Sequence, residues 1–149
     1  MGQFELHLNG KKVGEDVLEP GWTNYRKTCL YRQYDLTSQI TQGGHSLGVM
    51  LGNGMYNATR GRYMKFTGSF GQPKLIAHLH IEYADGSSQT VATDDTWRVA
   101  DGPVVFSSVF GGEDYDARLE QPGWDRAGFN NSKWQPATVG VSPGGRLTG

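Results

Sequence analysis

The sequence has little of what marks a disulfide-linked domain, a membrane protein or an exported precursor. It holds one cysteine, Cys29, which excludes an intrachain disulfide framework and a CxxC zinc site. No apolar run approaches the roughly 20 residues that a membrane-spanning helix needs. The first residues lack the basic and apolar segments of a signal peptide, so we expect none there.

Excess charge and catalytic motifs are absent as well. With 14 basic and 15 acidic side chains the formal net charge is −1, so the chain has no electrostatic footprint for nucleic acid or for an acidic membrane. There is no GxSxG or HExxH motif, and no two carboxylates are placed as a glycosidase would need them across a cleft. The sequence therefore predicts no catalytic residue and no enzymatic activity for this chain alone.

What the chain does contain is strand patterns separated by glycine-rich turns. Residues 4–8 alternate and end at Asn9-Gly10, a strong hairpin signal. Residues 74–83 alternate in the same way, which places His78 and His80 together on a polar, solvated face. Residues 28–36 are typical of a long strand and residues 46–51 of a buried one. No stretch shows the helical period of 3.6 residues over 10–12 positions. Short strands at this spacing predict an all-β fold, an antiparallel β-sandwich or jelly roll.

The 149 residues suffice for one domain. We assign residues 1–138 to the β-sandwich and interpret residues 139–149, which are glycine-rich and weakly patterned, as a flexible linker or an end introduced by cloning. One face of a sandwich strand must be apolar. On that basis the predicted core consists of Leu6, Leu8, Leu47, Val49, Leu75, Leu79, Ile81 and Val91.

Residues 113–134 form the most informative part of the chain. They combine acids, amides, an arginine and aromatic rings with little apolar periodicity. Carboxylates and amides can hydrogen-bond a sugar while flat rings cover its C–H face, so the run indicates a carbohydrate site that includes Asp114 and Asp116. The same acids could ligate a hard cation such as calcium, which prefers several oxygens. The alternatives remain a well-bonded loop that ties two sheets together and a salt bridge from Asp116 to Arg118.

Two further loops carry candidate sugar-binding residues. Gly52 and Gly54 flank Asn53, and glycines let the backbone approach a ligand closely. The amide of Asn53 offers both a donor and an acceptor, and Tyr56 follows three residues later. Trp22 lies after a Pro-Gly turn, where we expect its ring to cap one end of the core, with stacking on a sugar as the alternative.

Six segments in order along the chain resemble the N-terminal β-sandwich domain of bacterial α-L-rhamnosidases, a family of glycoside hydrolases. They are residues 5–25, 47–56, 81–87, 93–98, 112–118 and 123–134. The resemblance covers nearly the whole chain, and it implies an accessory domain whose catalytic (α/α)6 barrel lies elsewhere in the parent protein.

The resemblance also implies partners. These are a rhamnose-containing carbohydrate and the other domains of a parent enzyme that is periplasmic or secreted, with neither nucleic acid nor a membrane among them. No cofactor is required, although calcium could take part because some relatives bind rhamnose through it. We expect a non-catalytic domain that assists binding or orientation of rhamnose-containing glycans. The alternative is a purely structural interdomain module that supports the barrel.

Overall fold

The computed structural model describes residues 1–58, 63, 65, 68–142 and 144–149. Within them the chain is all-β, as expected, and its one helical element is the 3-10 turn η1 (Ala117–Leu119). The strands are β1 (Gln3–Leu8), β2 (Lys11–Lys12), β3 (Thr28–Leu30), β4 (Leu47–Gly52), β5 (Asn57–Ala58), β6 (Gly68–Ser69), β7 (His78–Glu82), β8 (Ser88–Ala92), β9 (Arg98–Val99), β10 (Val104–Ser108), β11 (Gly112–Tyr115), β12 (Gln135–Pro136) and β13 (Arg146–Thr148).

The central sheet has the order β2-β1-β4, and both pairings are antiparallel. Its hairpin turns at Asn9 and Gly10, whose φ angles are 52° and 83°. Positive φ at both central positions defines the type I′ turn, for which Asn-Gly is the preferred sequence. The hairpin prediction is therefore confirmed.

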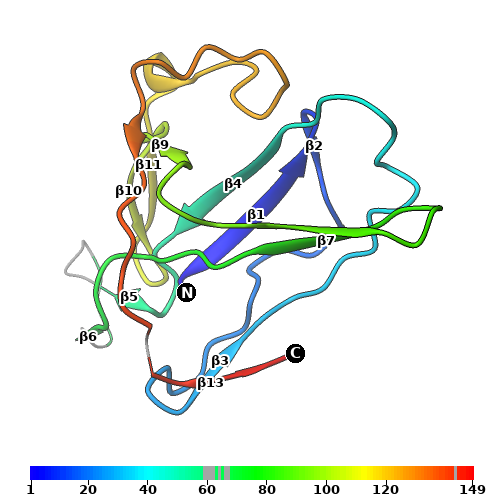
Figure 1. Cartoon of the computed structure of the whole chain (residues 1–149). Helices are drawn as coiled ribbons and strands as arrows, with labels where there is room; N and C mark the ends of the chain where they lie inside the picture. Colours follow the sequence, from blue (N-terminus) through cyan, green and yellow to red (C-terminus); the bar gives the residue numbers. More distant parts are fainter. Residues whose placement is uncertain (59–62, 64, 66–67, 143) are drawn as a thin grey trace.

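Every other pairing among the described residues is two-stranded: β5–β6, β7–β8, β9–β12, β10–β11 and β3–β13. Four of these are antiparallel, whereas β13 pairs with β3 in parallel. Figure 1 shows β13 alongside β3 at one end of the molecule, away from the β1–β4 sheet. Residues 146–148 are thus part of a sheet, and the interpretation of residues 139–149 as a flexible linker is wrong for them.

The core consists of two small clusters of side chains. In the first, Leu8, Val13 and Leu36 are buried. In the second, Tyr25, Cys29 and Tyr56 are buried, and Met1 packs against them. Each cluster lies between a loop and a strand, so segments without regular structure supply much of the buried surface.

The predicted core list is confirmed only in part. Leu8 is buried, and Leu6, Leu47 and Leu79 are partly buried against its cluster. Val49, Leu75 and Ile81 are half-buried. Val91 is 39% exposed, so its assignment to the core is wrong. Its strand β8 pairs only with β7 among the described strands.

Two strand predictions were too long. Residues 28–36 were expected to form one strand, but β3 ends at Leu30, where its three-residue pairing with β13 also ends. Residues 74–77 were expected to belong to the next strand, but β7 begins only at His78. Before it, the backbone N–H of Ala77 donates to the side-chain hydroxyl of Thr93 at 3.2 Å. The alternation of His78 and His80 holds, and both are exposed on β7 as expected for a solvated face.

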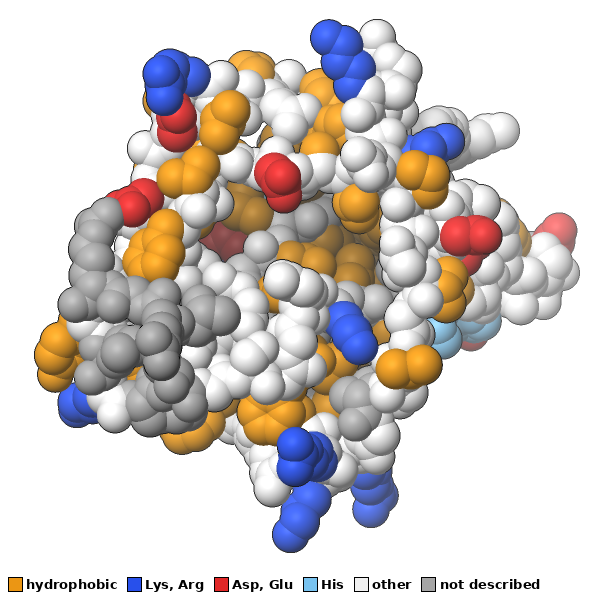
Figure 2. Space-filling model, turned by 90° about the vertical axis from the view of Figure 1, so that its left-hand side faces the viewer, with side chains coloured by type: hydrophobic (Ala, Val, Ile, Leu, Met, Phe, Trp, Pro, Cys, Tyr) orange, Lys and Arg blue, Asp and Glu red, His pale blue; other side chains and the backbone are white. Residues whose placement is uncertain are grey.

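The chain has a large surface for its mass. Its accessible area is 10744 Å², whereas a closely packed monomer of 16.4 kDa exposes about 7,500 Å². On the side of the molecule that carries β10 and β11, Figure 2 shows a hollow with hydrophobic side chains inside it. None of the described segments is a helix long and apolar enough to cross a membrane.

Candidate functional site

The loop at Asn53 is bound to the β10–β11 hairpin. The Asn53 amide donates to the backbone oxygen of Ser107 at 3.2 Å and to its hydroxyl at 3.0 Å. Its own oxygen accepts from the Asn57 amide at 2.9 Å. Ser107 lies opposite Glu113 in the register of β10 and β11, and Phe106 lies opposite Asp114. The structure therefore brings the loop of Asn53 close to the strand that holds Asp114.

Asp116 is engaged by its neighbour Arg118. The guanidinium donates to both carboxylate oxygens, at 2.8 and 2.6 Å, and the backbone N–H of Arg118 donates to one of them at 3.0 Å. These hydrogen bonds favour the charged form and lower the pKa of the Asp116 carboxyl. The carboxylate also caps the start of η1. The salt-bridge alternative for Asp116 is thus what the structure contains.

Asp114 and Asp116 offer few free oxygen ligands for a calcium ion. Asp114 is half-buried on β11, and Asp116 already accepts three hydrogen bonds from Arg118. Within the part of the chain that the structure describes, no three His, Cys, Asp or Glu side chains gather so that they could hold a metal ion. A calcium site at Asp114 and Asp116 would need most of its oxygen ligands from outside these side chains.

Tyr56 and Trp22 have opposite environments. The Tyr56 side chain is 2% exposed, its hydroxyl donates to the Phe70 carbonyl at 3.0 Å, and burial raises its pKa. Tyr56 is therefore a buried structural residue next to the Asn53 loop. Trp22 is 67% exposed, so the expectation that it caps the core is wrong, because an indole that covers a core would be largely buried.

The polar run at residues 121–134 is held by contacts within the run and by contacts with other strands and loops. The Trp134 indole N–H donates to the Gln121 side chain at 2.8 Å, and the Phe129 ring lies 5.6 Å from that of Trp134. Trp124 packs over β4 at Gly48, where an added Cβ would meet its ring at 2.5 Å. This arrangement matches the expected alternative of a bonded loop that ties separate sheets together.

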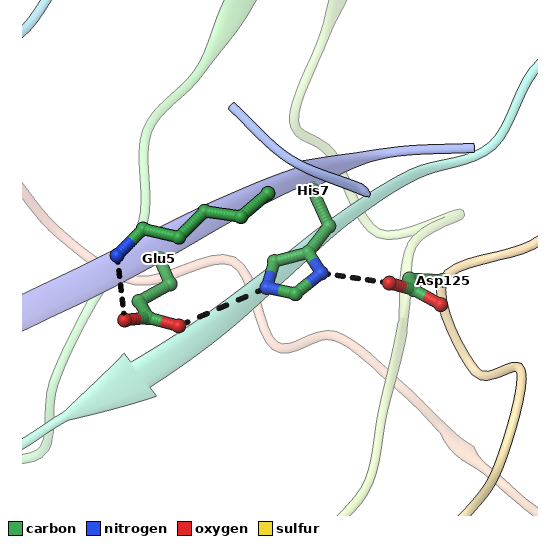
Figure 3. A network of polar contacts seen from close by, with 4 residues as sticks. Glu5, His7 and Asp125 are labelled. Carbon is green, nitrogen blue, oxygen red and sulfur yellow. Dashed lines mark hydrogen bonds and ion pairs between the residues drawn. The ribbon is translucent and has the colours of Figure 1, made fainter. Parts of the chain in front are cut away.

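The charged network on β1 was not predicted from the sequence. His7 Nδ1 lies 2.7 Å from an oxygen of Asp125, so this nitrogen carries the proton that the carboxylate accepts. The other ring nitrogen is buried without a hydrogen bond and lies 3.8 Å from Glu5, which pairs with Lys12 at 2.9 Å. Figure 3 shows that Glu5 and Asp125 flank the imidazole on opposite sides.

This network is a tie between distant segments. Asp125 is 8% exposed, and the His7 ring also contacts the Trp124 ring at 5.2 Å. The contacts fix the loop of residues 124–125 against the face of β1 opposite Leu6 and Leu8. One signal in the sequence pointed to it: Glu5 and His7 alternate with the apolar residues of β1, so they share its other face.

Fold and site together define an all-β domain whose polar side chains mostly tie strands and loops to one another. Residues 1–148 match the family model of the α-L-rhamnosidase N-terminal domain. The chain belongs to this family, as its sequence resemblance indicated, and is the non-catalytic N-terminal domain of such proteins.

Relatives named α-L-rhamnosidase occur in Streptomyces avermitilis, at 42% identity over 135 residues, and in Formosa agariphila, at 36% over 142 residues. Each alignment covers 90% of this chain and only 13% and 14% of the respective relative.

Two solved structures are similar over nearly the whole chain. An α-L-rhamnosidase from Dictyoglumus thermophilum aligns with a TM-score of 0.86 at 39% identity, covering 99% of this chain and 16% of that one. The S. avermitilis α-L-rhamnosidase in complex with L-rhamnose aligns with a TM-score of 0.88 at 39% identity, covering 97% of this chain and 14% of that one. The chain thus spans a small part of the proteins it matches.

Proposed function

We propose that this domain is a structural module of an α-L-rhamnosidase, which packs against the remainder of the enzyme and supports its catalytic domain. The observation that carries this proposal is the open surface. The accessible area of 10744 Å² exceeds that of a closely packed monomer by about 3,000 Å². Large obligate interfaces bury about 2,000–5,000 Å² summed over both partners, so the excess on this chain is large enough for its share of such an interface.

The distribution of apolar side chains supports the same function. Among the described residues seven hydrophobic side chains are buried, whereas 19 large ones are exposed. Scattered exposed apolar residues are normal, but a contiguous patch indicates a contact surface. Hydrophobic side chains inside the hollow of Figure 2, on the side of β10 and β11, fit a surface that another domain covers.

The test compares the isolated chain with the full-length enzyme that contains it. Hydrogen exchange should be slower in β10 and β11 when the rest of the enzyme is present. Val105, which is 57% exposed on β10, and Ile76, which is 65% exposed, are the sites for substitution by lysine. Each substitution should leave the isolated chain nearly as stable as before and lower the melting temperature of the full-length enzyme.

A matched control is Thr90→Lys on β8, which adds the same charge at an exposed polar position. Equal exchange rates for β10 and β11 in the isolated chain and in the enzyme would contradict the proposal. So would full-length variants at Val105 and Ile76 that melt like the Thr90→Lys control.

Binding of a rhamnose-containing glycan is the second candidate function. It is favoured by the contact between the Asn53 loop and β10, which lies beside Asp114, and by the exposed indole of Trp22. One relative of known structure is described in complex with L-rhamnose. Calorimetry of the chain with L-rhamnose, with and without calcium, tests it. Heat that disappears in Asp114→Asn would support the site, and no heat under either condition would reject it.

A further inference from the structure

A small pocket of about 320 Å³ opens beside the aromatic cluster of Tyr25, Tyr56 and Phe70. The Tyr25 ring meets the other two edge to face, at 5.1 and 5.3 Å, and Tyr56 stacks on Phe70 at 5.8 Å. Phe70 is 43% exposed, whereas both tyrosines are buried. The pocket lies at the small end of the range for ligand sites, a size that suits a single sugar ring.

The charged residues that line this pocket are all basic. Arg26 and Lys74 line it, and none of its lining residues is acidic, although the chain as a whole has a net charge of −1. The Arg26 guanidinium lies 5.9 Å from the centre of the Phe70 ring. The Lys74 ammonium makes one long hydrogen bond, 3.4 Å, to the Val141 carbonyl. Neither cation has a carboxylate partner among the described residues.

Two cations that have no carboxylate partner among the described residues have a definite chemical preference at an aromatic surface. Guanidinium and ammonium groups bind carboxylates through charge-assisted hydrogen bonds. An exposed phenyl ring packs against the C–H face of a sugar, since both surfaces are apolar. A neutral sugar would leave both charges without an anionic partner, and a simple anion would make no contact with the exposed part of the Phe70 ring. The ligand that uses both features is a sugar that bears a carboxylate.

We propose that this pocket binds a uronic acid unit of a polysaccharide, with its carboxylate on Arg26 and Lys74 and its ring against Phe70. Of the sugar-binding residues predicted from the sequence, Tyr56 lines this pocket, whereas Asn53, Asp114, Asp116 and Trp22 do not. The site therefore goes beyond the proposed function and does not depend on how the domain packs against the rest of an enzyme.

The experiment is a titration of the 149-residue chain, by calorimetry or by NMR chemical shifts, with D-galacturonate, D-galactose and acetate. Galacturonate and galactose differ only in a carboxylate against a hydroxymethyl group. We expect saturable binding of galacturonate, weakened by added salt. Galactose should bind at least tenfold more weakly, as the loss of one charge-assisted hydrogen bond predicts. Acetate keeps the carboxylate but lacks the sugar ring that packs against Phe70, and it should also bind at least tenfold more weakly.

Variants locate the site. Arg26→Gln and Lys74→Gln should each weaken galacturonate binding at least tenfold, while Lys11→Gln, which removes an exposed lysine of β2, should not change it. Circular dichroism verifies that each variant is folded. The proposal is overturned if galacturonate does not bind, if galactose or acetate binds as tightly, or if the Arg26 and Lys74 variants behave like the Lys11 control. These outcomes are independent of the hydrogen-exchange test of interdomain packing.

Discussion

Replacing Gly48 by alanine tests whether the indole of Trp124 is held rigidly over the central sheet. A Cβ at position 48 would lie 2.5 Å from one ring carbon of Trp124 and 3.2 Å from two others. Ordinary van der Waals contact between carbons begins near 3.5 Å, so either the indole or strand β4 must move. The indole is restrained, because its ring contacts His7 and the adjacent Asp125 is bound to the same histidine.

The expected magnitude follows from two opposing effects. Overpacking of this kind costs about 1–3 kcal/mol. Against it, alanine restricts the unfolded chain and contributes about 0.4–1 kcal/mol of stability wherever the backbone accepts it, and Gly48 does not have a positive φ. The net expectation is a loss of about 1–2 kcal/mol, measured by urea unfolding followed through tryptophan fluorescence and circular dichroism.

Two further variants make the reasoning refutable. Gly102→Ala is the control, since a Cβ there meets nothing within 4 Å and its φ is not positive. It should be neutral or slightly stabilising. In the Trp124→Leu background, Gly48→Ala should lose most of its effect. If Gly48→Ala is as mild as Gly102→Ala, or costs the same in both backgrounds, the indole does not constrain this strand.

Four other outcomes are expected. Leu8→Ala should destabilise the chain by about 2–5 kcal/mol in urea unfolding, because Leu8 is 4% exposed at the centre of its cluster. Asp125→Leu leaves a partly buried imidazole without its acceptor and should cost about 1–3 kcal/mol, part of which His7→Leu should restore when the two are combined. Burial raises the pKa of Tyr25 and of Tyr56 above the ordinary value of 10.0, so the stability that their neutral forms contribute is present below pH 10.0 and is lost as pH rises further. The hydrogen bond to Glu120 raises the pKa of Tyr115 as well, so ultraviolet absorbance titration of the Tyr115→Phe variant should still show two late tyrosinates, and their absence would argue against the burial. The purified chain should not hydrolyse an aryl rhamnoside, and turnover that persists through purification would refute its non-catalytic assignment.

Local patterns predicted the parts of the fold that depend on neighbours in sequence. Asn9-Gly10 determined a type I′ hairpin because only residues that tolerate positive φ fit that turn. The alternation around His78 and His80 correctly predicted an exposed polar face of β7. In both cases the deciding contacts lie within a few residues of the pattern.

Features that depend on distant partners could not be predicted in the same way. The length of β3 follows from its partner β13, which lies at the far end of the chain. The exposure of Val91 follows from the lack of a described strand beyond β8. Asp116 was weighed as a sugar ligand and as the partner of Arg118, and composition alone could not decide between them. Geometry could, since the guanidinium contacts both oxygens.

The parallel pairing of β13 with β3 constrains the order in which this domain can form. In this ladder Thr28 pairs with Arg146 and Leu30 pairs with Thr148. The bonded residues His7 and Asp125 are likewise 118 residues apart in the chain. Contacts of such long sequence separation form slowly, because the entropy of closing the loop must be overcome before the contacts are gained. During synthesis β3 therefore stays without its partner β13 until nearly the whole chain has emerged, and this interval is when the domain is most exposed to aggregation.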